Sequence, residues 1–189
     1  MMRLIRDVLD FTRARLGGGL SVEPKPADMR IICRFVAEEQ SLASSTPVLW
    51  KAEGDVAGTW DSDRIVEALS NIVGNAIQHA SPGTAVTLEA RDEQDGVVVA
   101  ITNEGPPIPP AMLPYIFEPF RRAEAAEQMR AKESTHLGLG LYIASQIVRS
   151  HGGWIDAQSA TGRTTFSFRL PRRPRMPDRD AAPAADAMT

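Results

Sequence analysis

One long amphipathic helix constrains the fold of this chain more than any other segment. The sequence predicts that it begins at Asp61-Ser62-Asp63, whose side chains are good N-caps, and ends at Ser81-Pro82-Gly83. Its apolar residues recur at helical spacing and trace one face: Ile65, Leu69, Ile72, Val73, Ala76 and Ile77. Because only one face is apolar, the helix must pack that face against a second layer of secondary structure.

The rest of the sequence supplies strands for that layer. Residues 85–90 and 97–102 are apolar or alternating runs separated by a polar turn, which predicts an antiparallel hairpin. Further strands are predicted at 48–50, 154–157 and 164–170, and further helices at 26–44, 111–116 and 138–150. Helices gathered with an antiparallel sheet predict an α+β fold built as a two-layer sandwich.

The two ends of the chain are predicted to lie outside this domain. Residues 4–16 carry a helical apolar stripe that ends at Gly17-Gly18-Gly19, so residues 1–19 are interpreted as a separate helix and linker. Residues 171–189 contain no Val, Ile, Leu or aromatic residue and are predicted to be disordered. The ordered domain is therefore expected over residues 20–170.

Charge and apolar length exclude several classes of protein. The chain has 21 Lys and Arg against 24 Asp and Glu, a net charge of −3, without the basic excess of a domain that binds nucleic acid or anionic membrane by charge. The most apolar stretch, residues 137–144, is far shorter than the roughly 20 residues that cross a bilayer. We therefore expect a cytoplasmic protein with no nucleic-acid partner and no membrane insertion. The single cysteine, Cys33, excludes an intramolecular disulfide.

A polar stripe on the long helix is the first candidate site. Asn71, Asn75, Gln78 and His79 share a face beside the apolar one. An Asn oxygen is a ligand suited to Mg²⁺, and an Asn amide can donate to a phosphate oxygen. The stripe could therefore hold a metal nucleotide, and the alternative is an ordinary solvated helix face.

Two further segments have features of a ligand site. Asn103 to Ile108 follows directly on a predicted strand and could reach a base in a cleft, although a proline-stiffened loop explains it as well. Leu137 to Leu141 places two glycines at a helix start, where backbone N–H groups can bind an anion. Between them, residues 121–137 are highly charged, and we interpret them as a mobile cover or as a solvated helix.

In this order and spacing the segments resemble the ATP-binding catalytic domain of sensor histidine kinases, within the superfamily of gyrase, heat-shock chaperone and mismatch-repair ATPases. The resemblance covers residues 4–171. Four motifs carry it, the N box Asn71–Ala76, the first glycine box Asn103–Ile108, the F box Phe117–Phe120 and the second glycine box Gly138–Leu141. It implies a Bergerat-type two-layer α/β sandwich with a mixed, mainly antiparallel sheet, a mobile lid, and ATP and Mg²⁺ as ligands.

The resemblance also implies residue roles. Asn75 would coordinate Mg²⁺, Asn71 would hold the phosphate region, and Asn103 would meet the adenine amine. Asn71 and Arg122 are expected to be catalytic, with Arg122 reaching the γ-phosphate. The other residues expected at the nucleotide are Gln78, His79, Gly105, Ile108, Phe117, Phe120, Gly138, Leu139, Gly140, Leu141 and Thr164.

The sequence departs from the family pattern at four places. Asn103 stands where Asp is usual, Pro107 replaces a glycine, and Gln78 stands where Lys is frequent. The turn at residues 160–164 is one residue short. A neutral amide accepts a weaker hydrogen bond than a carboxylate, so nucleotide binding is expected to be weaker than in typical members.

The position of Asn71 bears on the reaction. In hydrolysing members of the superfamily it holds a Glu that activates water, and an amide cannot act as that base. The histidines His79, His136 and His151 lie in no motif resembling an acceptor, whereas residues 4–16 resemble the end of a dimerisation helix. We therefore expect phosphoryl transfer to a histidine on a dimerisation domain outside this chain, with a response regulator as a further partner and a homodimer through the N-terminal helix. The alternatives are a non-catalytic nucleotide-sensing or scaffold module and a serine kinase of a regulator protein.

Overall fold

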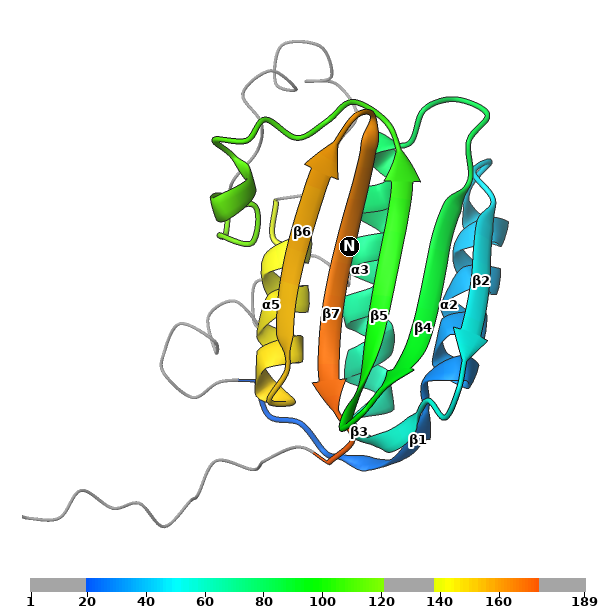
Figure 1. Ribbon diagram of the computed structural model, residues 1–189, viewed down its shortest axis with the longest axis vertical. Helices are drawn as coiled ribbons and strands as arrows, with labels where there is room; N and C mark the ends of the chain where they lie inside the picture. Colours follow the sequence, from blue (N-terminus) through cyan, green and yellow to red (C-terminus); the bar gives the residue numbers. More distant parts are fainter. Residues whose placement is uncertain (1–19, 121–137, 174–189) are drawn as a thin grey trace, which may run out of the picture.

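The computed structural model describes residues 20–120 and 138–173 (Figure 1). The elements follow one another as β1 (Lys25–Asp28), α2 (Met29–Ala43), β2 (Val48–Glu53), β3 (Ala57–Trp60), α3 (Ser62–His79), β4 (Val86–Glu93), β5 (Gly96–Glu104), the 3-10 helix η1 (Leu113–Tyr115), α5 (Gly140–Ser150), β6 (Trp154–Ala160) and β7 (Arg163–Pro171). No helix of these residues has the length and apolar character needed to cross a membrane.

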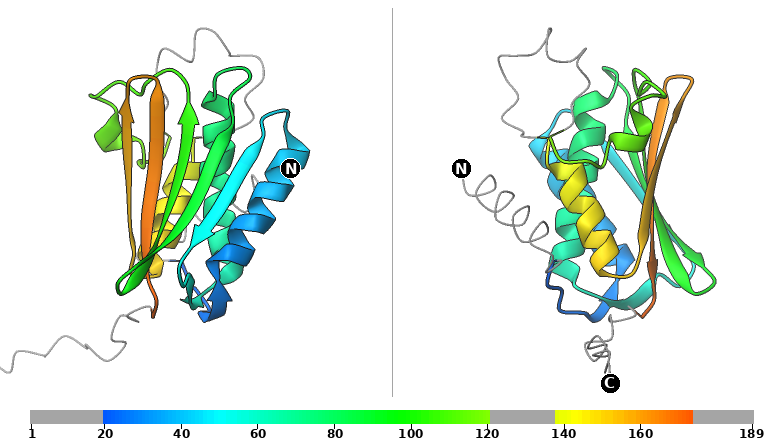
Figure 2. Two further views of the ribbon diagram at one scale, coloured as in Figure 1. Left: turned by 45° about the vertical axis from the view of Figure 1, so that its right-hand side comes forward. Right: turned by 90° about the vertical axis from the view of Figure 1, so that its left-hand side faces the viewer.

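The strands form a five-stranded sheet in the order β2-β4-β5-β7-β6. β2 pairs with β4 in parallel, and every other neighbouring pair of this sheet is antiparallel. α2, α3 and α5 lie on one face of the sheet, and the opposite face is not covered by a described helix (Figure 2). The predicted α+β sandwich with a mixed, mainly antiparallel sheet is therefore confirmed.

The core lies between the helices and the inner face of the sheet. Along β5 the side chains of Val97, Val99 and Ile101 are fully buried, while the residues between them face the open side. On α3 the predicted apolar stripe is buried except at Ile77, which is half-buried, and its members Leu69 and Ile72 have no exposed surface. Burying each such side chain stabilises the fold by about 1.5–3 kcal/mol.

α3 begins and ends at the residues that the sequence indicates. The Asp61 carboxylate accepts a hydrogen bond from the backbone N–H of Arg64 at 3.2 Å and so caps the first turn. At the other end the N–H of Ser81 donates to the carbonyl of Glu104 at 2.7 Å. The end of α3 is thereby fixed beside the end of β5.

The segment before α2 differs from the prediction. Residues 26–28 belong to β1, which pairs antiparallel with β3 in a separate two-stranded sheet, and α2 begins only at Met29. Asp28 explains the later start, because its side chain accepts from the N–H of Arg30 at 2.8 Å as the N-cap. Pro26 has no N–H and suits a short edge strand better than a helix interior.

Other boundaries also move. β2, β6 and the β4–β5 hairpin extend beyond the predicted strands, and the helix expected over 111–116 is the single turn η1. The predicted domain end at residue 170 is too early, because Pro171 completes β7 and the Arg172 guanidinium donates to the carbonyls of Asp55 and Ala57 at 2.6 and 2.7 Å. The predicted N-terminal helix, the lid and the rest of the predicted tail fall outside the described residues.

Candidate nucleotide-binding site

The motifs singled out in the sequence meet at one end of the domain, the upper end in Figure 1. β5 and α3 both end there, α5 begins there, and the turn between β6 and β7 closes the same edge. Segments far apart in the sequence are thus brought together by the folding of the two layers.

The polar stripe of α3 faces the start of α5 at Asn71. The Asn71 side-chain nitrogen is buried and has no hydrogen-bond partner among the described residues. A Cβ atom added at Gly140 would lie 3.5 Å from both Cγ and Oδ1 of Asn71, which is ordinary contact distance. An unsatisfied buried donor costs about 1–3 kcal/mol, so this nitrogen is poised to donate to a ligand.

The start of α5 adds backbone donors to the same place. Leu139 is the N-cap residue, its side chain makes no capping hydrogen bond, and it is 2% exposed. Gly138 has a φ of 70°, which glycine adopts without strain, and the helix begins at Gly140. The first N–H groups of α5 can therefore interact with an anion next to Asn71.

Residues that could hold Mg²⁺ are few on this surface. Asn75 is half-buried on α3, one turn beyond Asn71, and Gln78 and His79 are exposed near the helix end. Over the described ranges, no group of three or more His, Cys, Asp or Glu residues could hold a metal. In nucleotide enzymes Mg²⁺ is bound through one or two protein oxygens together with the phosphates of the nucleotide. The side-chain oxygen of Asn75 fits this kind of binding, whereas a site made of protein ligands alone is not present among the described residues.

Asn103 lies on the inner face of β5, one residue before the strand ends at Glu104. It is 2% exposed, and its side-chain nitrogen donates to the backbone carbonyl of His79 at 3.4 Å. The amide nitrogen is thereby directed at the end of α3. The side-chain oxygen is left as the acceptor of this residue, which suits it to an amino group of a ligand.

The close approach of the His79 carbonyl requires a glycine at position 105. A Cβ atom at this position would lie 2.1 Å from the carbonyl oxygen of His79, a distance that no real side chain allows. The N–H of Gly105 donates to the carbonyl of Gly162 at 2.8 Å. The loop after β5 is therefore held between the end of α3 and the β6–β7 turn.

A hydroxyl pair links the same loop to the sheet. Thr164, 3% exposed, lies opposite Asn103 in the β5–β7 register, and its Oγ1 is 2.8 Å from the Oγ of Ser159. Ser159 also accepts from the N–H of Ile108 at 2.8 Å. Sequence reasoning missed Ser159, although β6 alternates and Ser159 takes a core-facing position in line with Ile155 and Ala157.

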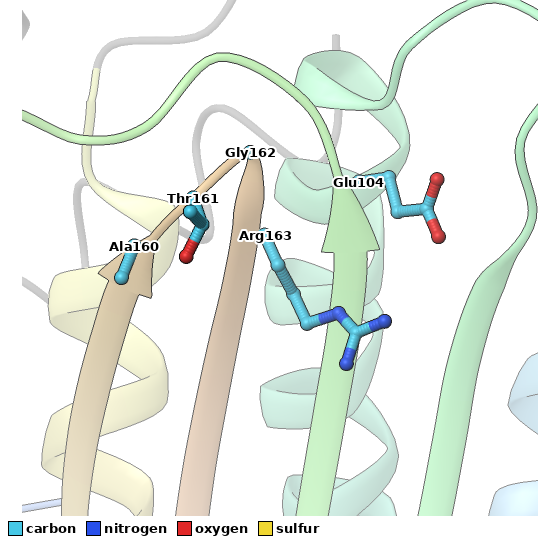
Figure 3. A pocket seen from close by; sticks show the side chains of 5 residues that line it. All are labelled: Glu104, Ala160, Thr161, Gly162 and Arg163. Carbon is cyan, nitrogen blue, oxygen red and sulfur yellow. The ribbon is translucent and has the colours of Figure 1, made fainter.

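The shortened turn is a two-residue hairpin. Thr161 and Gly162 have φ values of 50° and 76°, and Ala160 and Arg163 pair directly across it. An open pocket of about 370 Å³ lies at this turn, lined by Glu104, Ala160, Thr161, Gly162 and Arg163 (Figure 3). The alternation of β5 and β7 turns Glu104 and Arg163 away from the helices, so this pocket is separate from the face that carries Asn103 and Thr164.

The two phenylalanines of the F box, Phe117 and Phe120, lie in different environments. Phe117 packs edge-on against Phe166 of β7, with ring centroids 6.4 Å apart, which anchors the segment after η1 to the inner face of the sheet. Phe120 is 57% exposed with a φ of 62°. Leu141, in the first turn of α5, is half-buried, and Arg122 lies outside the described residues.

Comparison with known proteins agrees with this geometry. Residues 60–174 match the family model of the histidine kinase-, DNA gyrase B- and HSP90-like ATPases. A bacteriophytochrome of Pseudomonas aeruginosa is 34% identical over 92% of this chain, and the probable sensor histidine kinase TcrY of Mycobacterium tuberculosis is 32% identical over 89%. The chain spans 24% and 35% of the lengths of these two proteins.

A solved structure gives the same result for the fold. The catalytic domain of histidine kinase ThkA is 26% identical, with a TM-score of 0.67 over 80% of this chain and 99% of that domain. The family model covers more than half of the chain and includes α3, Asn103 and the start of α5. The chain therefore belongs to the histidine kinase-, DNA gyrase B- and HSP90-like ATPase family, as an ATP-binding catalytic domain of the sensor histidine kinase type.

Proposed function

We propose that this domain binds Mg·ATP between α3 and α5 and presents its γ-phosphoryl group to a histidine on a dimerisation domain. The buried, unpartnered nitrogen of Asn71 beside Gly140 carries the proposal. A donor in that condition is costly in the free domain, and a phosphate oxygen would satisfy it. In a hydrolytic site this position would need a general base that takes a proton from water, and an amide cannot act as a general base.

Each group of the site has a distinct part. Asn71 and the first N–H groups of α5 bind and orient the phosphates, and Asn75 would hold Mg²⁺ through its side-chain oxygen. When bound, the ion supplies charge neutralisation for the phosphates. Asn103 accepts from the amino group of the base, and Gln78 and His79 border the triphosphate. Catalysis then consists mainly of positioning, because phosphoryl transfer needs little covalent participation by the protein.

The acceptor histidine and the response regulator are proposed partners outside this chain. His151, a histidine of the described residues, is fully buried and bonded on both ring nitrogens, so it cannot receive a phosphoryl group without unfolding of its surroundings. A homodimer through residues 4–16 would bring the domain next to its acceptor helix. Arg122, on the proposed lid, would reach the γ-phosphate and complete the charge neutralisation.

The test combines the chain with labelled Mg·ATP and a separately produced dimerisation domain. We expect acid-labile, alkali-stable label on the histidine of that domain, and none when its histidine is replaced by Ala. A parallel reaction with a serine-containing regulator protein tests the serine kinase alternative, whose product is acid-stable.

Three departures of the sequence from the family pattern bear on the non-catalytic alternative. Asn103, Pro107 and Gln78 replace groups that strengthen binding in typical members, and these replacements favour a nucleotide-sensing or scaffold module. Binding of Mg·ATP with no label transferred to any dimerisation domain would support that module and contradict the kinase.

A further inference from the structure

An apolar stripe on the outer face of α2 lies outside the core of the described residues. The helix buries its opposite face in the domain, whereas Ile31, Phe35 and Leu42 are 58%, 54% and 89% exposed. Scattered apolar side chains are ordinary on a protein surface, but apolar side chains gathered on one face often mark an interaction site. The folding of this domain alone therefore does not account for the stripe.

The residues of this stripe have the spacing of a coiled-coil seam. Ile31, Phe35, Glu38 and Leu42 follow one another at intervals of four, three and four residues, so they form one line along α2. All four are exposed, and three of them are apolar. Because this spacing presents one line of side chains to a neighbouring helix, the stripe suits a helix as its partner.

The position of α2 leaves the stripe accessible. α2 is the outermost of the three helices on the β2 side of the domain, because α3 lies between it and α5 (Figure 1). The proposed nucleotide site lies on the other side of α3, beside the start of α5. A partner helix on α2 would therefore leave that site open.

The charges beside the stripe are divided between the two halves of α2. Arg30 and Arg34 lie in the N-terminal half, and Glu38 and Glu39 lie in the C-terminal half, all four exposed. Within the described part of the chain, neither Arg34 nor Glu38 makes an ion pair. A second α2 running antiparallel would bring each basic half against an acidic half, whereas a parallel one would bring like charges together. The stripe is thus complementary to an antiparallel copy of itself.

We propose that this stripe is a self-association surface, on which α2 of a second copy of the chain packs antiparallel about a two-fold axis. In this arrangement Ile31 of each copy faces Leu42 of the other, and Phe35 faces Glu38. Arg34 of each copy then lies beside Glu38 of the other, so two equivalent ion pairs flank the apolar contacts. Every contact occurs twice, as the symmetry of such an interface requires.

The size of the surface makes this association weak. α2 has 15 residues and is therefore about 22 Å long. One pair of such helices covers less than the roughly 800 Å² per partner that a standard stable interface buries. We therefore expect a dissociation constant of about 10 μM to 1 mM.

The test is sedimentation velocity of the full chain at concentrations from about 10 μM to 1 mM. Phe35→Glu places a carboxylate against Glu38 of the other copy, and we expect it to weaken the association about tenfold or more. The matched control is Leu49→Glu, because Leu49 is an equally exposed apolar residue, at 59%, on the outer face of β2. It should leave the association unchanged, and both variants should keep the wild-type melting temperature and Mg·ATP affinity.

A pair of charge reversals tests the antiparallel arrangement without changing the apolar residues. Arg34→Glu or Glu38→Arg alone places like charges together at both ion pairs, and each is expected to weaken the association about threefold to tenfold. In an equimolar mixture the two variants offer each other opposite charges at both positions. The mixture should therefore associate as strongly as the wild type, a recovery that a folding defect in either variant cannot produce.

An association through residues 4–16 would respond to none of these changes, so only the association that Phe35→Glu removes is assigned to α2. Equal sedimentation of the wild type, Phe35→Glu and Leu49→Glu at every concentration would overturn the proposal. A mixture of Arg34→Glu and Glu38→Arg that associates no more than its components would also overturn it. Wild-type protein that binds no Mg·ATP would contradict the proposed function and not the role of α2.

Discussion

The imidazole of His151 accepts a hydrogen bond from the backbone N–H of Asp61 across 3.0 Å. Its other ring nitrogen lies 2.8 Å from the carbonyl oxygen of Ile147, which can only accept, so the ring is neutral with its proton on Nδ1. This fully buried ring joins the start of α3 to the end of α5, the two helices that hold Asn71 and Gly140. This neutral histidine thus helps to fix the placement of Asn71 relative to the start of α5.

The first prediction concerns pH. Burial holds the pKa of His151 below its ordinary value of 6.5, so the unfolded chain binds a proton more readily than the folded domain. The stability that the neutral ring contributes is therefore present above pH 6.5 and is lost as pH falls below it. Urea unfolding at pH 7.5 and 5.5 measures this loss.

His151→Gln provides the comparison, because carboxylates also titrate as pH falls. We expect the stability difference between the two pH values to be smaller in His151→Gln than in the wild type. An equal difference in both proteins would show that His151 makes no contribution to the acid sensitivity.

The second prediction separates binding from stability at Asn71. Replacement by Ala removes an unpartnered buried nitrogen, so the free domain loses little stability, in contrast to the 2–5 kcal/mol expected for Leu69→Ala in the core. The affinity for Mg·ATP is expected to fall about tenfold or more, because a donor to a phosphate is lost. Thermal unfolding and calorimetry measure the two effects, and a destabilised variant with full affinity would contradict this role.

The third prediction compares two glycines of the site. Gly140→Ala places a methyl group at ordinary contact distance from Asn71, so the domain should fold with equal or slightly higher stability and bind Mg·ATP more weakly. Gly105→Ala places the methyl group on the His79 carbonyl and should lower the free energy of unfolding by about 1–3 kcal/mol. The opposite order of melting temperatures would contradict the described packing.

The fourth prediction concerns Asn103→Asp, which restores the residue usual in the family. The new carboxylate would be buried and would face the carbonyl oxygen of His79. It would also lack the side-chain N–H with which Asn103 donates to that carbonyl. Its pKa is expected to rise, so the variant loses stability relative to the wild type as pH rises from 5 to 8. Unfolding curves at both pH values measure this, and a variant more stable than the wild type at pH 8 would refute it.

Much of the fold could be predicted because its signals are local. The caps and apolar period of α3 lie within the segment itself, and the alternation of the β4–β5 hairpin needs no distant partner. β1 could not be found this way, because its pairing with β3 depends on residues about thirty positions away. The contacts of Arg172 with Asp55 are likewise long-range. They hold Arg172 on the domain, although the composition of residues 171–189 predicts disorder.

The site was predictable to a smaller extent. The boxes indicated Asn71, Asn103 and Gly140 by position, and the structure places Gly140 beside Asn71 and Asn103 beside the end of α3. The partner that orients Asn103 is the backbone carbonyl of His79, and the hydroxyl of Ser159 contacts Thr164 and the N–H of Ile108. A carbonyl carries no signal in the sequence, and Ser159 lies beyond the end of the strand predicted there.

The central claim is that Asn75 and the groups around it bind Mg·ATP. Calorimetric titration of the wild type, Asn75→Ala and the outer-face control Gln158→Ala with Mg·ATP tests it most directly. We expect one nucleotide per chain for the wild type and the control, with no detectable binding for Asn75→Ala and marked weakening of wild-type binding when Mg²⁺ is omitted. Equal affinity of Asn75→Ala and the wild type would contradict the site.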